Sequence, residues 1–256
     1  MSAEFAQPKP AELSVPFMNT RRDWKAAMVA LRKLLANGND TVQVFRIMRA
    51  LNAGNGARNY HRLLEAPGGG PIAYRRTELA QLFSDPAYIA AFKPGTVGAT
   101  YRDFLARTGY SAMGLAEVAN SDNIPHETEH PYSWFGRRER DIHDIWHVLT
   151  GYQADEPAGE ACLVAFSFAQ TKGLGWAAIA AGASLKARKV TGSWRFARAV
   201  IEGYRRGKRA QWLSGQDYEQ LMHEPIEQAR KRLRLGEPVR YRALQTWLAE
   251  RGFTGL

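Results

Sequence analysis

Apolar residues recur at helical spacing along most of this chain of 256 residues, and that periodicity constrains the fold more than any other feature. Residues 23–36, DWKAAMVALRKLLA, repeat apolar side chains every three or four positions, the stripe of an amphipathic helix. Comparable segments follow at 40–51, 59–65, 77–83, 85–92, 96–105, 193–213, 217–235 and 238–251. No segment shows the strict alternation of a half-buried strand. The sequence therefore predicts an all-α protein with a single multi-helix domain.

Glycine and proline mark the expected boundaries of these helices. The run Pro67–Pro71, with glycines at its three central positions, predicts a loop within the domain. Because Pro125 and Pro131 bracket His126 and His130, the stretch 120–134 is expected to be a solvated loop. Residues 1–19 contain prolines and no apolar run, which predicts a disordered leader without a secretory signal, before a domain at 20–256.

The stretch 140–160, RDIHDIWHVLTGYQADEPAGE, concentrates the chemistry of the chain. His143, Asp144 and His147 lie in one expected helix, within about 100° of its circumference. Pro157 suits the first turn of the next helix, which would return Glu160 toward the histidines. Imidazoles and carboxylates are ligands for zinc, iron or manganese and need no thiolate. The pattern predicts a divalent metal site, with Zn²⁺ as the first choice and Fe²⁺ or Mn²⁺ as the others.

A purely structural role for the same residues is the alternative. One or both histidines would then pack in the core, and Asp144 would pair with Arg140, one helical turn earlier. His130 lies close before this helix and is a further candidate ligand.

The 23 residues 163–185 are almost continuously apolar but carry Lys172 and Gly173 near their centre. A charge is costly inside a bilayer and glycine breaks helices, so we expect two mostly buried helices separated at Lys172 and no membrane span. Small residues at 177–183 would allow a neighbouring helix to pack closely, or would leave room for a long apolar ligand. In the second case an apolar lipid groove lies beside the metal helix, with substrate contacts at Phe166, Trp176 and Ile179.

Most of the formal net charge of +10 comes from residues 186–256, which hold 16 Lys and Arg against 7 Asp and Glu. These cations are interleaved along helical segments without a nucleic-acid motif, which favours a solvated face or anionic lipid headgroups over nucleic acid. No GxxxxGK and no dinucleotide fingerprint is present, so nucleotide-dependent chemistry is not expected. The single cysteine, Cys162, excludes an intrachain disulfide and is expected to be packed.

The run HDIWHVLTGY at 143–152 resembles the Coq4 family of ubiquinone biosynthesis proteins, as do KPGTVGATYRDFL before it, ACLVAFSFAQ after it and YRRGKRAQWLSGQDYEQLMHEPIEQARKRL further on. The resemblance covers about residues 24–235. It implies that HDxxH…E is a metal site, generally taken as zinc, with the ligands His143, Asp144, His147 and Glu160. Twelve residues separate His147 from Glu160, one more than in the family pattern, which makes Glu156 a rival ligand.

The resemblance also implies a peripheral membrane protein that organises other ubiquinone-biosynthesis enzymes. Its implied activity is of the lyase type, removing the C1 carboxyl of a polyprenylated 4-hydroxybenzoate-type ring, coupled to hydroxylation there. A metal ion with an open position could polarise that carboxylate as a Lewis acid. A non-catalytic, metal-stabilised lipid-binding scaffold is the alternative, and a metal phosphohydrolase is a third reading. We expect a cytoplasmic protein at the inner face of the cell membrane with a polyprenylated quinone precursor as its ligand, and leave a homodimer open.

Overall fold

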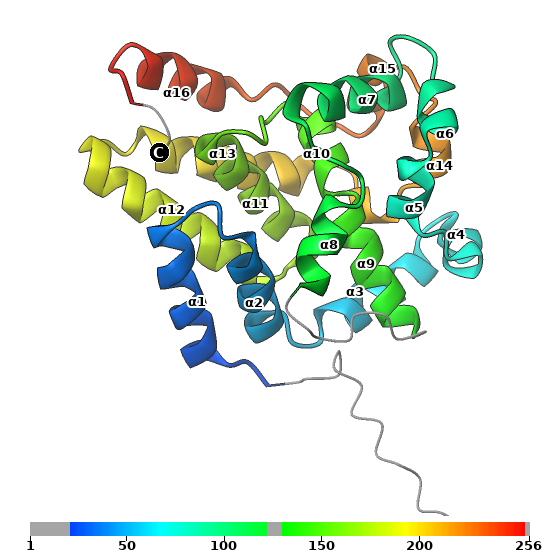
Figure 1. Cartoon of the computed structure of the whole chain (residues 1–256), viewed down its shortest axis with the longest axis horizontal. Helices are drawn as coiled ribbons and strands as arrows, with labels where there is room; N and C mark the ends of the chain where they lie inside the picture. Colours follow the sequence, from blue (N-terminus) through cyan, green and yellow to red (C-terminus); the bar gives the residue numbers. More distant parts are fainter. Residues whose placement is uncertain (1–20, 122–129, 254–256) are drawn as a thin grey trace, which may run out of the picture.

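The structure is a computed structural model and describes residues 21–121 and 130–253. The regular secondary structure of these ranges is helical (Figure 1). The helices are α1 (Trp24–Ala36), α2 (Thr41–Leu51), α3 (Asn55–Glu65), α4 (Gly69–Arg75), α5 (Leu79–Ser84), α6 (Pro86–Ala90), α7 (Val97–Thr108), α8 (Gly114–Asn120), α9 (Pro131–Asp141), α10 (His143–Thr150), α11 (Pro157–Thr171), α12 (Leu174–Thr191), α13 (Arg195–Arg209), η2 (Leu213–Gly215), α14 (Tyr218–Leu221), α15 (Ile226–Arg232) and α16 (Val239–Ala249). Within those ranges, β-type pairing is limited to an isolated bridge between Thr96 and Pro225. The all-α prediction is confirmed, whereas the predicted leader at 1–19 lies outside the described residues.

Local sequence signals set several of these boundaries. The Thr96 hydroxyl accepts a hydrogen bond of 3.2 Å from the Ala99 amide at the start of α7. Pro157 opens α11, as its spacing predicts, because the first turn of a helix does not use the missing N–H. Lys172 adopts a left-handed conformation with φ 61° and separates α11 from α12. The predicted break in the apolar segment 163–185 is therefore confirmed.

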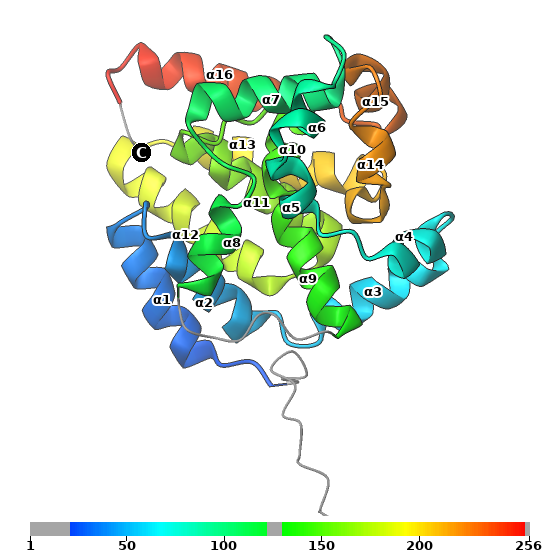
Figure 2. The ribbon, with the colours of Figure 1, turned by 45° about the vertical axis from the view of Figure 1, so that its right-hand side comes forward.

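The centre of the domain is the pair α11 and α13, which pack on each other more extensively than any other helices of the described part (Figure 2). Two glycines of α13, one helical turn apart, allow this approach. A Cβ at Gly203 would lie 2.4 Å from the Cys162 carbonyl oxygen, and one at Gly207 would lie 2.6 Å from the Phe166 carbonyl oxygen. Only a residue without a side chain fits there. The main apolar core includes residues from α1 to α16, and a second, smaller cluster joins α3, α4 and α9.

Small residues of α12 accommodate the N-terminal helices. A Cβ at Gly175 would lie 2.6 Å from the sulfur of Met48 in α2, and one at Gly182 would lie 3.2 Å from Leu31 in α1. Close helix packing thus accounts for these two glycines, and the described residues show no lipid groove beside α10, the helix that carries His143 and His147. None of the helices in the described ranges is long and apolar enough to cross a membrane.

Arg140 and His143 do not share a helix, contrary to the prediction. α9 ends at Asp141, and α10 begins at His143 after Ile142, whose φ and ψ are −87° and −2°. Arg140 forms an ion pair of 2.7 Å with its neighbour Asp141, the last residue of α9. The Arg140–Asp144 pair of the purely structural alternative is therefore not formed, because residues one turn apart face each other only within a continuous helix.

Three other predicted boundaries also differ. The run 67–71 is not a loop throughout, since α4 begins at Gly69 and accepts Pro71 in its first turn. The stretch 217–235 is two helices, α14 and α15, separated at Pro225. Pro131 opens α9, so the predicted loop 120–134 contains the start of a helix, and its residues 122–129 lie outside the described ones.

Candidate metal centre

Two consecutive helices bring His143, His147 and Glu160 together. The histidines lie one turn apart on α10, and Glu160 lies in the first turn of α11, after the chain has reversed at 151–156. Glu160 Oε1 lies 3.2 Å from His147 Nε2, and Oε2 lies 3.7 Å from His143 Nε2. The three ligand atoms all lie within 4.8 Å of one another, a spacing at which one metal ion could bind all three.

The orientation of His147 is fixed by the turn that follows α10. Its Nδ1 lies 2.9 Å from the Tyr152 carbonyl oxygen, which can only accept, so Nδ1 donates the proton. In the neutral imidazole Nε2 therefore presents its lone pair to Glu160, and this atom is buried without a hydrogen-bond partner among the described residues. An imidazole lone pair facing a carboxylate requires a cation, either a proton or a metal ion. The residues present thus fit a bound metal ion.

The charges of the group are mutually stabilising. Although burial opposes ionisation, the imidazoles of His147 and His143 hold the pKa of Glu160 well below its usual range. Burial favours the neutral form of His147, but Glu160 and Asp144 outweigh it and raise the pKa of the imidazole. A metal ion at Nε2 of His147 would take the place of a proton there, so metal binding would compete with protonation of the imidazole.

Aromatic rings flank both histidines. The indole of Trp176 from α12 stacks on His143 with ring centroids 5.8 Å apart, and Phe104 from α7 stacks on His147 at 6.3 Å. Tyr110 contacts Phe104 edge-on at 6.0 Å. The side chain of His147 is 1% exposed, that of His143 15% and that of Glu160 41%, so access from solvent is on the side of Glu160.

Of the two rival carboxylates, Glu160 faces the histidines. Glu156 points instead to the C-terminal helix, where its carboxylate accepts hydrogen bonds from Tyr241 and, at 3.0 Å, from Gln245. Asp144 is buried beside the group, and its pKa is raised by burial against the opposing effect of the two histidines. It does not belong to the three-residue cluster, and its role as a fourth ligand stays a prediction.

The other predicted site residues lie at different depths. Trp176 is half-buried against His143, whereas Phe166 is completely buried and packs edge-on against Trp146 at 6.0 Å. Ile179 is 9% exposed. Cys162 is buried, as predicted, and burial raises the pKa of its thiol, which makes it inert. The predicted contacts of these side chains with a substrate stay predictions.

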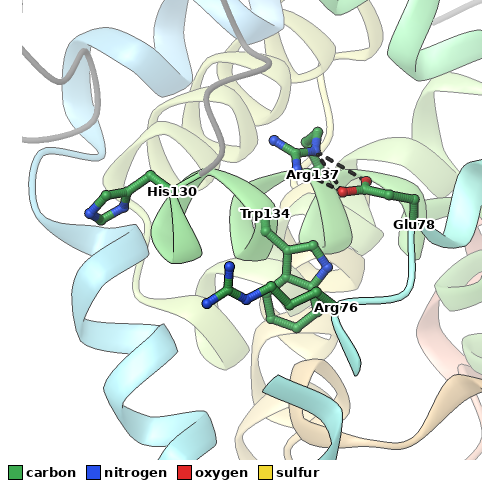
Figure 3. A pocket seen from close by; sticks show the side chains of 5 residues that line it. All are labelled: Arg76, Glu78, His130, Trp134 and Arg137. Carbon is green, nitrogen blue, oxygen red and sulfur yellow. Dashed lines mark hydrogen bonds and ion pairs between the residues drawn. The ribbon is translucent and has the colours of Figure 1, made fainter. Parts of the chain in front are cut away.

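His130 belongs to a separate pocket of about 340 Å³, which is lined by residues of α9 and of the segment between α4 and α5 (Figure 3). Its Nδ1 accepts a hydrogen bond of 3.2 Å from the Tyr132 amide and caps α9. In the same pocket Arg137 pairs with Glu78 at 2.7 Å, and Arg76 and Trp134 also line it. This placement gives His130 a helix-capping role, away from the group of His143, His147 and Glu160.

Phe104 and the Tyr152 carbonyl are parts of the site that the sequence analysis did not assign. Phe104 had the helical spacing of a core residue, and no local pattern shows that its ring covers a histidine. The carbonyl belongs to the turn immediately after α10, so the signal for it was Gly151, which ends that helix with φ 77°. Both also line an open pocket of about 280 Å³ between α7 and the turn after α10.

The fold and this group define the class: an all-helical protein in which two histidines and a carboxylate on successive helices could hold a metal ion. Residues 27–238 match the family model described as coenzyme Q (ubiquinone) biosynthesis protein Coq4. The chain therefore belongs to the Coq4 family.

Individual relatives agree with this assignment. A mitochondrial ubiquinone biosynthesis protein of Botryotinia fuckeliana is 24% identical over 196 residues, 74% of this chain and 65% of that protein. Its counterpart in Podospora anserina is 27% identical over 191 residues, 72% of this chain and 58% of that protein. The chain thus spans less than two thirds of the length of these relatives. The fold also resembles a crystal structure of a candidate ubiquinone biosynthesis protein from Nostoc punctiforme, with a TM-score of 0.61, 21% identity, and coverage of 84% of this chain and 100% of that one.

Proposed function

We propose that this protein acts in ubiquinone biosynthesis as a metal-dependent enzyme on a polyprenylated 4-hydroxybenzoate-type ring. The reaction removes the C1 carboxyl group as carbon dioxide and places a hydroxyl group on the same carbon. The observation that carries the proposal is the placement of His147 Nε2, which is buried 3.2 Å from Glu160, with His143 completing the set.

The ligand set supports chemistry at the metal. Three protein ligands leave coordination positions for substrate or water, as in catalytic zinc sites, and two histidines with one carboxylate are also the set of non-haem iron oxygenases. When bound, the ion supplies a Lewis acid for the ring carboxylate. Exchange of carboxyl for hydroxyl removes two electrons from the ring, so we assign dioxygen as the oxidant. It takes up the two electrons and two protons and leaves as hydrogen peroxide, and water supplies the oxygen of the new hydroxyl group. Zn²⁺ has no redox chemistry, hence Fe²⁺ or Mn²⁺ would fit a direct reaction with dioxygen and Zn²⁺ would need a separate oxidant.

The residues of the chain orient the partners of this reaction. His143, His147 and Glu160 hold the ion, and the Tyr152 carbonyl keeps the proton of His147 on Nδ1. Trp176 is the substrate contact best supported by the geometry, because it is half-exposed and stacks on His143. Phe166 and Ile179 would back the polyprenyl tail from the core side of the same helices.

We further propose peripheral association with the inner face of the cell membrane, where the prenylated precursor and the other quinone-biosynthesis enzymes would be met. The tip formed by the end of α12 and the start of α13 supports this. Leu185 and Val190 are 62% and 52% exposed there, and Trp194 is 51% exposed with the Arg188 guanidinium 5.4 Å from its ring. Apolar side chains among cations suit an anionic lipid surface.

Two measurements test the proposed reaction. Purified protein loaded with Zn²⁺, Fe²⁺ or Mn²⁺ is incubated with a short-chain prenylated 4-hydroxybenzoate under air, and carbon dioxide and the hydroxylated product are quantified without partner enzymes. We expect turnover with at least one metal and none in His147→Ala. Bound metal without turnover would instead support the lipid-binding scaffold, and release of phosphate from simple esters would support the phosphohydrolase.

A further inference from the structure

The C-terminal helix α16 contacts the turn between α10 and α11, the two helices that carry the candidate metal ligands. It lies along α13 at the edge of the bundle and also packs on α11 (Figure 1). The match to the Coq4 family model ends at residue 238, immediately before α16 begins at Val239. Any contribution of α16 to the site therefore comes from a part of this chain that the family match does not include.

One side chain of this helix, Tyr241, is fully committed to the turn at 151–156. Its hydroxyl donates to the Glu156 carboxylate and accepts a hydrogen bond of 3.0 Å from the backbone amide of Gln153. It also accepts from the Gln245 amide group at 2.9 Å, which completes the hydrogen bonds that a phenol can make. The residue is 1% exposed, so losing any of these partners would leave a buried polar group unpaired.

The hydrogen bonds and ring contact of Tyr241 affect both α10 and α11, the helices that carry His143, His147 and Glu160. Glu156 is the N-cap residue of α11, and its backbone carbonyl accepts a hydrogen bond of 3.2 Å from the Glu160 amide. The position of Glu156 therefore sets the position of Glu160 in the first turn of α11. The Tyr241 ring packs edge-on against Tyr152, with centroids 5.1 Å apart, and the Tyr152 carbonyl orients His147. A single tyrosine thus restrains the turn residues next to two of the three candidate ligands.

The start of α16 is itself anchored. The Arg240 amide donates to Glu202 of α13 at 2.8 Å, and Arg206 of α13 donates to the carbonyls of Thr150, at 2.8 Å, and Gly236. The Arg206 guanidinium also lies 4.8 Å from the Tyr152 ring. Because α13 packs tightly on α11, these bonds hold Tyr241 at a fixed height relative to the turn.

We propose that Tyr241 is a positioning residue for the metal centre, acting through Glu156 and the Tyr152 carbonyl to hold Glu160 and His147 in ligand geometry. This inference rests on the proposed metal site. Hydrogen bonds behind metal ligands typically change metal affinity by about 10- to 100-fold, because they fix the orientation of the ligands before the ion binds.

The test uses the full chain and Co²⁺, whose visible absorption reports both affinity and ligand geometry. Tyr241→Phe keeps the ring against Tyr152 and removes the hydroxyl. We expect its dissociation constant for Co²⁺ to rise about 10-fold or more, with a changed absorption band.

Leu248→Ala is the matched control, since it removes a buried side chain of the same helix that has no polar contact with the turn. We expect it to lower Tm without changing Co²⁺ affinity. Equal weakening in Leu248→Ala and Tyr241→Phe would overturn the positioning role, as would an unchanged dissociation constant in Tyr241→Phe. Failure of the metal site itself is separate: it would appear as wild-type Co²⁺ binding in His147→Ala.

Discussion

The indole of Trp176 lies parallel to the imidazole of His143, with an interplanar angle of 4° and ring centroids 5.8 Å apart. The contact joins α12, which packs on the N-terminal helices, to α10, which carries both histidines. It places a tryptophan next to the metal-type group, where it can report on the binding of an ion.

We expect Co²⁺ to quench part of the intrinsic tryptophan fluorescence, and Trp176→Phe to abolish most of that quenching while retaining one bound ion. A paramagnetic ion quenches a neighbouring indole, and Trp176 is the tryptophan stacked on a candidate ligand. Fluorescence titration of the two proteins measures this. Trp194→Phe, at the exposed tip of α13, is the control and should leave the quenching intact. Equal quenching in Trp176→Phe would place the ion elsewhere.

Replacement of the ligands should separate a three-ligand site from a four-ligand one. Glu160→Gln removes the charge that faces both imidazoles, so we expect loss of stoichiometric metal. Asp144→Asn changes a buried carboxyl outside the cluster, and we expect it to retain one ion per chain. Metal analysis after dialysis decides both. If Asp144→Asn loses its metal, the site has four protein ligands, and the scaffold reading is favoured over catalysis.

Gly203→Ala should destabilise the fold, because its Cβ would lie 2.4 Å from the Cys162 carbonyl oxygen in the tightest helix pair. Overpacking of this kind costs about 1–3 kcal/mol or more of unfolding free energy. Gly136→Ala in α9 is the matched variant, since its Cβ would meet nothing within 4 Å. There we expect a gain of about 0.5–1 kcal/mol from the higher helix propensity of alanine. Urea denaturation of both variants checks the opposite signs.

The stability should also depend on pH through Glu139. This carboxyl accepts hydrogen bonds from Asn59 and Ser214, at 3.3 and 3.1 Å, but burial raises its pKa to about 7. In the unfolded chain the pKa is 4.5, so between these values the folded state binds the additional proton. The stabilisation of the folded state by the protonated Glu139 carboxyl is present in full below pH 4.5 and is lost as pH rises through about 7.

Unfolding free energy should therefore fall by about 2–3 kcal/mol between pH 5 and pH 8 from this residue. Glu139→Gln keeps an accepting oxygen but cannot titrate, so its stability should fall less over the same range. Denaturation curves of the two proteins across this pH range give the difference directly. Parallel pH profiles for wild type and Glu139→Gln would contradict the assignment.

The sequence by itself determined the features that depend on residues within a turn or two of each other. Helical spacing placed His143 and His147 on one face, Pro157 fixed the start of α11, and Lys172 with Gly173 divided the apolar segment. These are local effects of period, capping and helix breaking, and they operate before tertiary contacts form. Where a local signal was ambiguous, as at Ile142 between Arg140 and His143, the sequence did not show that the helix breaks.

The tertiary structure decided which groups meet. Glu156 and Glu160 are one turn apart on the same segment, and no local rule selects between them. The selection comes from α16, whose Tyr241 and Gln245 bind Glu156, and from the crossing of α11 over α10, which directs Glu160 to the histidines. The rings of Phe104 and Trp176 reach the site from helices distant in sequence. Such contacts depend on how whole helices pack. The glycines of α13 allow α11 to approach closely, but no short stretch of sequence shows which helices will meet.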